Sequence, residues 1–188
     1  MAGLPETSPN AQTRPRAGGG ARVRPEKPED IPEIRIVNQR AFGGPAEADL
    51  VDALRRNGKT VFSLVAEDDG RVVGHIFFSP VAIHSKGTGL TGVGLAPLAV
   101  IPERQNQGIG STLVEHGLRR CREEGHPYVV VLGHPNYYPR FGFVPASRFG
   151  IKSEYDVADE VFMVMELRDG ALNGWGGVAK YQPEFNEV

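Results

Sequence analysis

The sequence predicts a domain of the α/β class built on a mixed sheet, in which antiparallel strands come first and a central parallel strand–helix–strand crossover follows. Three observations support this prediction. Two stretches, at 29–42 and 45–56, carry apolar residues at helical spacing, and three apolar runs separated by turn residues come next. An apolar strand, a glycine-containing loop, an amphipathic helix and a second apolar strand then follow one another between 91 and 132. That order favours parallel pairing of the two strands.

The first ordered elements are a short strand and two helices. Residues 21–24 can form the strand. The helix at 29–42 begins with acidic residues, which suit the positive end of the helix dipole, and the pair Gly43-Gly44 ends it. The helix at 45–56 opens on a proline and closes at Asn57-Gly58. Neither helix carries an obvious catalytic constellation.

Three antiparallel strands are expected next, at 61–67, 72–84 and 91–100. The turn Asp-Asp-Gly-Arg between the first two is a hairpin signal, and a second turn lies at 85–89. The helix that follows has one small and apolar face, made by Gly110, Leu113, Val114, Gly117, Leu118 and Cys121.

The remaining sequence predicts two more strands. Residues 128–132 are continuously apolar, which indicates burial on both faces of the sheet. Residues 133–143 are rich in turn-forming and aromatic residues and leave room for only a short helix, and a final strand is expected at 161–167.

The domain organisation follows from composition. Residues 1–20 are rich in Pro, Gly, Ser and Thr and are expected to form a disordered tail. Residues 21–167 form the predicted domain. Residues 168–188 are rich in glycine but carry Trp175, Tyr181 and Phe185, so this extension is expected to pack on the domain.

Composition also bears on the class of protein. The net charge of −2 does not argue for nucleic-acid or anionic-membrane partners. No run of about 18 apolar residues and no signal-peptide core is present, so a cytoplasmic protein is expected. The single cysteine, Cys121, excludes an intramolecular disulfide and is interpreted as a core thiol. No metal site is predicted, and the chain is expected to be a monomer or a homodimer.

The loop at 102–108 leads into the N-terminus of a helix, where unpaired amides and the helix dipole favour an anion such as phosphate. A mononucleotide phosphate loop would require a lysine after Gly110, and Ser111 stands there. A dinucleotide-binding loop would require a third small residue where Leu113 stands. Taken alone, the two glycines are also compatible with an ordinary strand–helix turn.

Two motifs give a more specific interpretation. Gln105-x-x-Gly108-x-Gly110, preceded by Leu-Ala-Val-x-Pro, resembles the acetyl-coenzyme A loop of the GCN5-related N-acetyltransferase (GNAT) superfamily. The stretch Tyr138-Pro139-Arg140-Phe141-Gly142-Phe143 resembles a second motif of that superfamily, a tyrosine four residues before a Gly-Phe pair. The sequence around this tyrosine and the extension near 180–185 resemble the YhbS-like branch of the superfamily.

The resemblance implies a GNAT fold over about residues 21–167 and acetyl-CoA as cosubstrate. It implies that the backbone of Leu98, Ala99 and Val100 pairs with the pantetheine arm. The amides that would hold the pyrophosphate are those of Gln105, Asn106, Gln107, Gly108, Ile109, Gly110 and Ser111. Arg104 either reaches a phosphate or is a solvated arginine, and Arg140 is a candidate for the adenosine 3′-phosphate.

The implied reaction is attack of a neutral amine on the thioester. The N–H of Val100 or Ala99 would stabilise the oxyanion, and Tyr138 would protonate the departing thiolate, unless it is only an aromatic packing residue. Tyr137 is interpreted as structural.

A general base is harder to assign, because the strand at 91–100 has no carboxylate. Glu67, His75, His84 and His134 are the candidates, and water could also serve. The acceptor amine is not identified, and its pocket is expected from the two N-terminal helices and the loops near Ser85 and Gly150. The alternative function is a catalytically weak acyl-CoA-binding sensor or partner module.

Overall fold

A computed structural model of the chain describes residues 20–187, so the predicted disordered segment lies outside the described residues except for Gly20. The helices are α1 (Ile31–Phe42), α2 (Ala46–Arg56) and α3 (Ile109–Glu123). The strands are β1 (Arg22–Pro25), β2 (Phe62–Asp68), β3 (Arg71–Ser85), β4 (Thr88–Val100), β5 (Tyr128–Leu132), β6 (Val144–Pro145), β7 (Ile151–Ser153), β8 (Phe162–Glu166) and β9 (Gly177–Lys180). Short 3-10 turns connect several of them, among them Tyr138–Phe141 and Pro183–Asn186.

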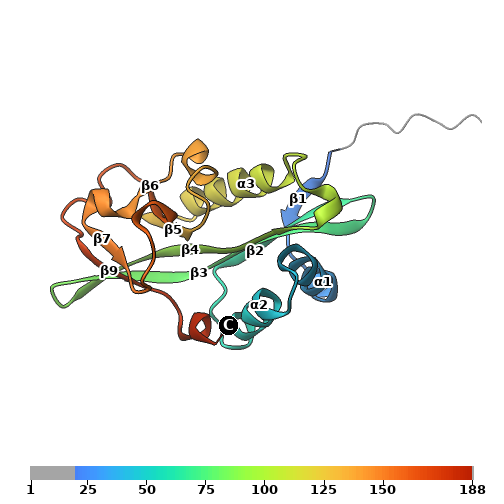
Figure 1. Ribbon diagram of the computed structural model, residues 1–188, viewed down its shortest axis with the longest axis horizontal. Helices are drawn as coiled ribbons and strands as arrows, with labels where there is room; N and C mark the ends of the chain where they lie inside the picture. The colour runs from blue at the N-terminus through green and yellow to red at the C-terminus, as the bar shows by residue number, and fades with distance from the viewer. Residues whose placement is uncertain (1–19, 188) are drawn as a thin grey trace, which may run out of the picture.

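The strands form one mixed sheet in the order β1-β2-β3-β4-β5-β8-β6, and β9 pairs with both β3 and β7. Strands β1 to β4 pair antiparallel, and β4 pairs parallel with β5 through the α3 crossover. Helix α3 covers one face of this sheet, while α1 and α2 cover the other (Figure 1). The predicted fold class, a mixed sheet with a central parallel crossover, is therefore confirmed.

Side chains alternate between the two faces, as the strand periodicity requires. On the α3 face, Phe62, Ile76 and Phe78 pack with Leu113 and Val114 in the largest core cluster. On the opposite face, Val65 and Phe77 pack against α1 and α2. Gly117 allows α3 to approach the sheet closely, since a Cβ there would lie 2.6 Å from Cζ of Phe78.

The extension after β8 contributes to the sheet. Strand β9 pairs with β3 at Ala82–His84 and parallel with β7, and Tyr181 beyond it is 8% exposed. Asn57 at the end of α2 donates a 2.7 Å hydrogen bond to the buried carboxylate of Glu184. Residues 177–187 thus connect the long β3–β4 hairpin with α2 (Figure 1). The short strands β6, β7 and β9 were not predicted, because runs of two to four residues carry no clear periodicity.

Strands β4 and β5 diverge after a very short pairing. Their register contains only Val93↔Val129 and Gly94↔Val130. Next along β4, the pairing with β3 shifts, so that Ile76 and Phe78 of β3 face Leu98 and Leu95 across an irregularity. Such a bulge bends the strand. The rest of β4 therefore keeps β3 on one side and opens to a cavity on the other.

A buried histidine lies in the middle of β3. His75 is fully buried, with Nδ1 3.1 Å from Nδ2 of Asn38 and Nε2 3.0 Å from Oγ of Ser63. Burial lowers the pKa of His75 to about 3, and the positive charge of Arg55 contributes in the same direction. The imidazole is therefore neutral in the folded protein near pH 7.

We expect the free energy of unfolding to decrease as the pH falls below 6.5, by up to about 1.4 kcal/mol per pH unit from this residue. The unfolded chain then binds a proton at His75 that the folded chain excludes until about pH 3. Urea unfolding between pH 5 and 7 measures the slope. His75→Gln should flatten the slope, whereas His84→Gln, on the exposed hairpin, should not; equal slopes in all three proteins would contradict this origin.

Candidate active site

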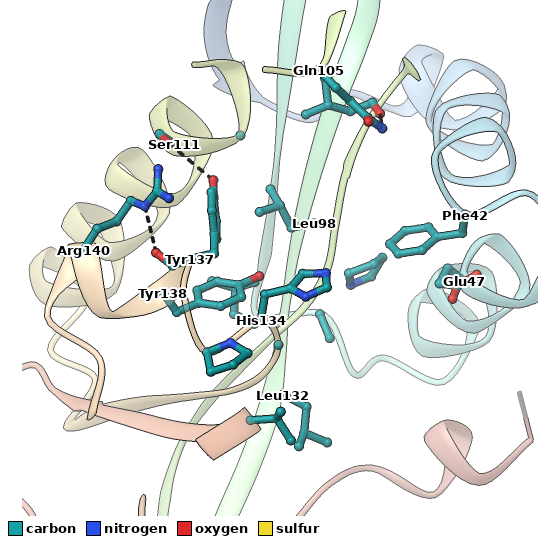
Figure 2. Close-up of a pocket in the computed structure, with 18 of the residues that line it drawn as sticks. Phe42, Glu47, Leu98, Gln105, Ser111, Leu132, His134, Tyr137, Tyr138 and Arg140 are labelled. Atoms are coloured by element: carbon teal, nitrogen blue, oxygen red, sulfur yellow. Dashed lines mark hydrogen bonds between the residues drawn. The ribbon is translucent and has the colours of Figure 1, made fainter. Parts of the chain in front are cut away.

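A cavity of about 1120 Å³ opens where β4 and β5 diverge. Its walls come from β4, the loop before α3, the start of α3, the segment after β5, and the α1–α2 connection (Figure 2). Most of the predicted site residues line it, namely Leu98, Val100, Arg104, Gln105, Asn106, Gly108, Gly110, Ser111, Tyr138 and Arg140. The loops at Ser85 and Gly150 do not, in contrast to the expectation for the acceptor pocket.

The backbone of β4 presents alternate residues to this cavity. The Ile101 N–H donates to the Val73 carbonyl at 3.0 Å, on the β3 side. Because hydrogen-bonding groups alternate along a strand, those of Leu98 and Val100 point away from β3. The carbonyl of Val100 accepts a 2.9 Å hydrogen bond from the Gln105 side chain, in agreement with this direction.

Ala99 differs from its two neighbours. It pairs with His75 of β3, and its side chain is 1% exposed among residues of the α1 face. Its N–H points toward β3 by the same alternation and so does not face the cavity.

The loop ends in a helix N-terminus with free amides. The Thr112 N–H is bonded to the Gly108 carbonyl in the first turn of α3, which leaves the amides of Ile109, Gly110 and Ser111 without an acceptor in the helix. Gly108 has φ +82°, a conformation that favours glycine. Gly110 keeps the space beside the Tyr137 hydroxyl open, since a Cβ there would lie 3.0 Å from that oxygen.

Two of the predicted loop residues, Gln107 and Ile109, do not direct their side chains into the cavity. Ile109 is 7% exposed and belongs to the core cluster, because it occupies the sheet-facing side of the first turn. The Gln107 side chain donates to the Glu103 carbonyl at 3.1 Å. Any part that these residues play toward a ligand would therefore be through their backbone.

The two arginines are placed differently. Arg104 lines the cavity with a side chain that is 27% exposed, and it forms an ion pair with Asp68, with 2.5 Å between Nη2 and Oδ2. Arg140 donates from Nε to the Tyr137 carbonyl at 2.9 Å, and its guanidinium lies 4.6 Å from the centre of the Tyr137 ring. Figure 2 shows this hydrogen bond to the Tyr137 carbonyl.

The rings of Tyr137 and Tyr138 in the second motif pack edge to face, with 5.1 Å between their centroids. Tyr138 is 7% exposed and also contacts Phe143 edge to face, which holds its ring in place. Its hydroxyl points into the cavity (Figure 2). Burial raises the pKa of Tyr138, so the hydroxyl stays protonated near neutral pH. Such a group can donate a proton.

Tyr137 contributes more to the cavity than its structural interpretation suggested. Its hydroxyl lies 3.4 Å from Oγ of Ser111, at the start of α3 (Figure 2). The sequence contains no signal for this contact, because the two residues are 26 positions apart and meet only after the crossover forms.

Gly133 determines where the Tyr138 ring sits. A Cβ at residue 133 would lie 2.2 Å from Cε2 of Tyr138. We expect Gly133→Ala to displace the ring and to lower the free energy of unfolding by about 1–3 kcal/mol. If Tyr138 acts in the reaction that the sequence resemblance implies, the turnover rate should also fall at least about tenfold. Urea unfolding and steady-state kinetics measure both effects; an active variant of unchanged stability would show that the ring position is unimportant.

Of the four candidate bases, His134 alone lines the cavity. Glu67 is paired with Arg24 at 2.7 Å, His75 is buried, and His84 lies in the hairpin far along β3. A carboxylate that the sequence analysis missed, Glu47, also lines it. In the sequence Glu47 is one of two acidic residues in the first turn of α2, and its position opposite His134 depends on the tertiary fold (Figure 2).

Residues 20–187 hold neither a candidate metal-binding cluster nor a helix that could span a membrane. They contain no group of three or more His, Cys, Asp or Glu side chains that could hold a metal ion. Over the same range, no helix combines the length and the apolar character needed to cross a membrane.

Residues 22–146 match the family model described as an acetyltransferase (GNAT) domain. The chain is 41% identical over 165 residues to the uncharacterized N-acetyltransferase YhbS of Escherichia coli K12, covering 87% of this chain and 98% of that protein. It is also 41% identical over 134 residues to the uncharacterized N-acetyltransferase YjhQ of the same strain, covering 70% and 74%.

Two solved structures are similar over most of their length. The E. coli GNAT family N-acetyltransferase YhbS, crystallised in complex with CoA, has a TM-score of 0.86 at 40% identity and covers 92% of this chain and 96% of that one. A GNAT family acetyltransferase from Brucella melitensis in complex with acetyl-CoA has a TM-score of 0.73 at 36% identity, covering 88% and 97%.

Proposed function

Because the chain belongs to the GNAT family of acetyltransferases, we propose that it transfers the acetyl group of acetyl-CoA to a primary amine. One observation carries the proposal: the free edge of β4, the free amides of α3 and the Tyr138 hydroxyl all face one cavity. The edge of β4 can pair with the amides of pantetheine, the amides of α3 can bind a pyrophosphate, and the hydroxyl can protonate a leaving thiolate. The relatives crystallised with CoA and acetyl-CoA support the same ligand.

The protein groups that would hold acetyl-CoA follow from the geometry. Leu98 offers its backbone N–H and C=O groups to the pantetheine arm and Val100 offers its N–H, since the Val100 carbonyl already accepts from Gln105. The amides from Asn106 to Ser111 would bind the pyrophosphate, with the Tyr137 hydroxyl and Arg140 near them. The predicted Gln105 amide is not free for this, because its N–H donates to the Pro102 carbonyl at 3.3 Å. Arg104 is not needed as a phosphate ligand, since its charge is balanced by Asp68.

In the reaction, the amine nitrogen forms a bond to the thioester carbon, and the carbon–sulfur bond breaks. The N–H of Val100 or Leu98 stabilises the charge that develops on the carbonyl oxygen. Tyr138 donates its proton to the departing sulfur and is reprotonated from the amine nitrogen as the amide forms. A catalytically weak binding module is less well supported, because Tyr138, Glu47 and His134 line the same cavity.

The proposal is tested in two steps. Saturating acetyl-CoA should raise the melting temperature, and unchanged melting at millimolar ligand would refute the coenzyme assignment. Thiol release in the presence of a panel of amines then separates an enzyme from a binding module. Cys121 will not disturb a thiol assay of the folded protein, because it is fully buried and its pKa is raised to about 12 by burial.

A further inference from the structure

The cavity has an end that the proposed coenzyme site does not use. It lies away from the start of α3, where Phe42 and Glu47 of the α1–α2 pair face Leu132 of β5 and His134 just after it (Figure 2). Leu50 of α2 also lines the cavity. The Tyr138 hydroxyl lies between the two ends (Figure 2). An acceptor must therefore enter from this end for its nitrogen to reach the thioester.

Glu47 is the charged side chain that this end presents. It is partly exposed, and no ion pair or hydrogen bond of its carboxylate occurs within residues 20–187. The two arginines that line the cavity lie toward the loop and α3, and both are engaged: Arg104 with Asp68 and Arg140 with Tyr137. This end of the cavity, the acceptor end, therefore presents one carboxylate that can bind a positively charged group and no free cation that could bind a carboxylate.

The remaining wall at this end is apolar. Phe42 is 45% exposed at the end of α1, which is unusual for a large aromatic side chain, and Leu50 and Leu132 continue the surface. A wall of this kind offers few partners for the polar groups of a peptide backbone or a sugar, so burying such groups there would cost free energy.

We propose that the acceptor is a small primary amine with one positive charge and an apolar, preferably aromatic, body. Glu47 binds the ammonium group and accepts one of its protons, and Phe42 packs against the apolar body. The neutral nitrogen then attacks the thioester, so that the ammonium and acetyl-CoA yield the amide, CoA with its thiol and one released proton. This inference rests on the proposed function and adds the chemical class of the acceptor.

The class is tested with matched amines. We expect the kcat/KM for 2-phenylethylamine to exceed the values for three other amines at least about tenfold. These are phenylalanine, which carries an additional carboxylate, spermidine, which carries additional positive charges, and a lysine-containing peptide. A higher value for any of these three would overturn the proposal. Thiol release with none of the amines would contradict the proposed function itself.

A binding measurement separates the two proposals. Calorimetric titration of 2-phenylethylamine into the protein saturated with CoA should show binding even if turnover is slow, and the neutral 2-phenylethanol should bind at least about tenfold more weakly. Absence of 2-phenylethylamine binding, or equal binding of the alcohol, would overturn the acceptor assignment while leaving the coenzyme site in place.

Three variants locate the interaction. Glu47→Gln should raise the KM and Kd for 2-phenylethylamine at least about tenfold, with the KM for acetyl-CoA unchanged. Glu115→Gln, an exposed position on α3 outside the cavity, is the control and should change neither value. Phe42→Ala should weaken the binding of 2-phenylethylamine and leave the binding of methylamine unchanged. Normal amine binding by Glu47→Gln would exclude Glu47 from the acceptor site.

Discussion

Replacing Tyr138 by phenylalanine should lower kcat at least about tenfold while the affinity for acetyl-CoA stays nearly unchanged. The substitution removes only the hydroxyl, and the ring keeps its edge-to-face contacts with Tyr137 and Phe143. Burial raises the pKa of Tyr138, so the wild-type hydroxyl is protonated near neutral pH and holds the proton that the departing sulfur requires. Steady-state kinetics of thiol release, with a separate titration of acetyl-CoA, measures both quantities.

The neighbouring residue provides a matched control. Tyr137→Phe removes a hydroxyl from the same motif, but one that lies 3.4 Å from Oγ of Ser111 at the start of α3. We expect this variant to weaken acetyl-CoA binding and to leave kcat largely unchanged. If Tyr138→Phe turned over at the wild-type rate, or if the two variants behaved alike, Tyr138 would not be the general acid.

Replacing Gly108 by valine should raise the Kd for acetyl-CoA at least about a hundredfold. Gly108 has φ +82° and precedes the first turn of α3. A side chain there is strained, and no protein atom lies within 4 Å of an added Cβ, so the new methyl groups would occupy the space before the free amides. Isothermal titration with acetyl-CoA measures the loss directly.

The effect of strain alone can be measured at the other end of the same helix. Gly125 has φ +78°, and an added Cβ there also meets no protein atom within 4 Å. Gly125→Val should therefore show a similar loss of thermal stability with wild-type affinity for acetyl-CoA. Wild-type affinity in Gly108→Val, or equal loss of affinity in both variants, would refute the assignment of the loop.

Most of the fold could be predicted because its elements carry local patterns. The amphipathic face of α3, the hairpin turn before Arg71 and the apolar run of β5 are each visible within about fifteen residues. The loop and tyrosine motifs are local as well, so both could be placed on the chain and ordered before their spatial relation was known.

The sequence by itself thus determined the order of the helices and of the longer strands, and it placed a glycine-containing loop before α3 and a tyrosine motif after β5. The tertiary structure alone decided that Arg104 pairs with Asp68, that Ala99 turns its backbone to β3, and that Glu47 lies across a cavity from His134. The physical reason is the range of the interactions. Helix and strand patterns arise from neighbours along the chain, whereas these contacts depend on the bulge in β4 and the crossover, which bring distant segments together.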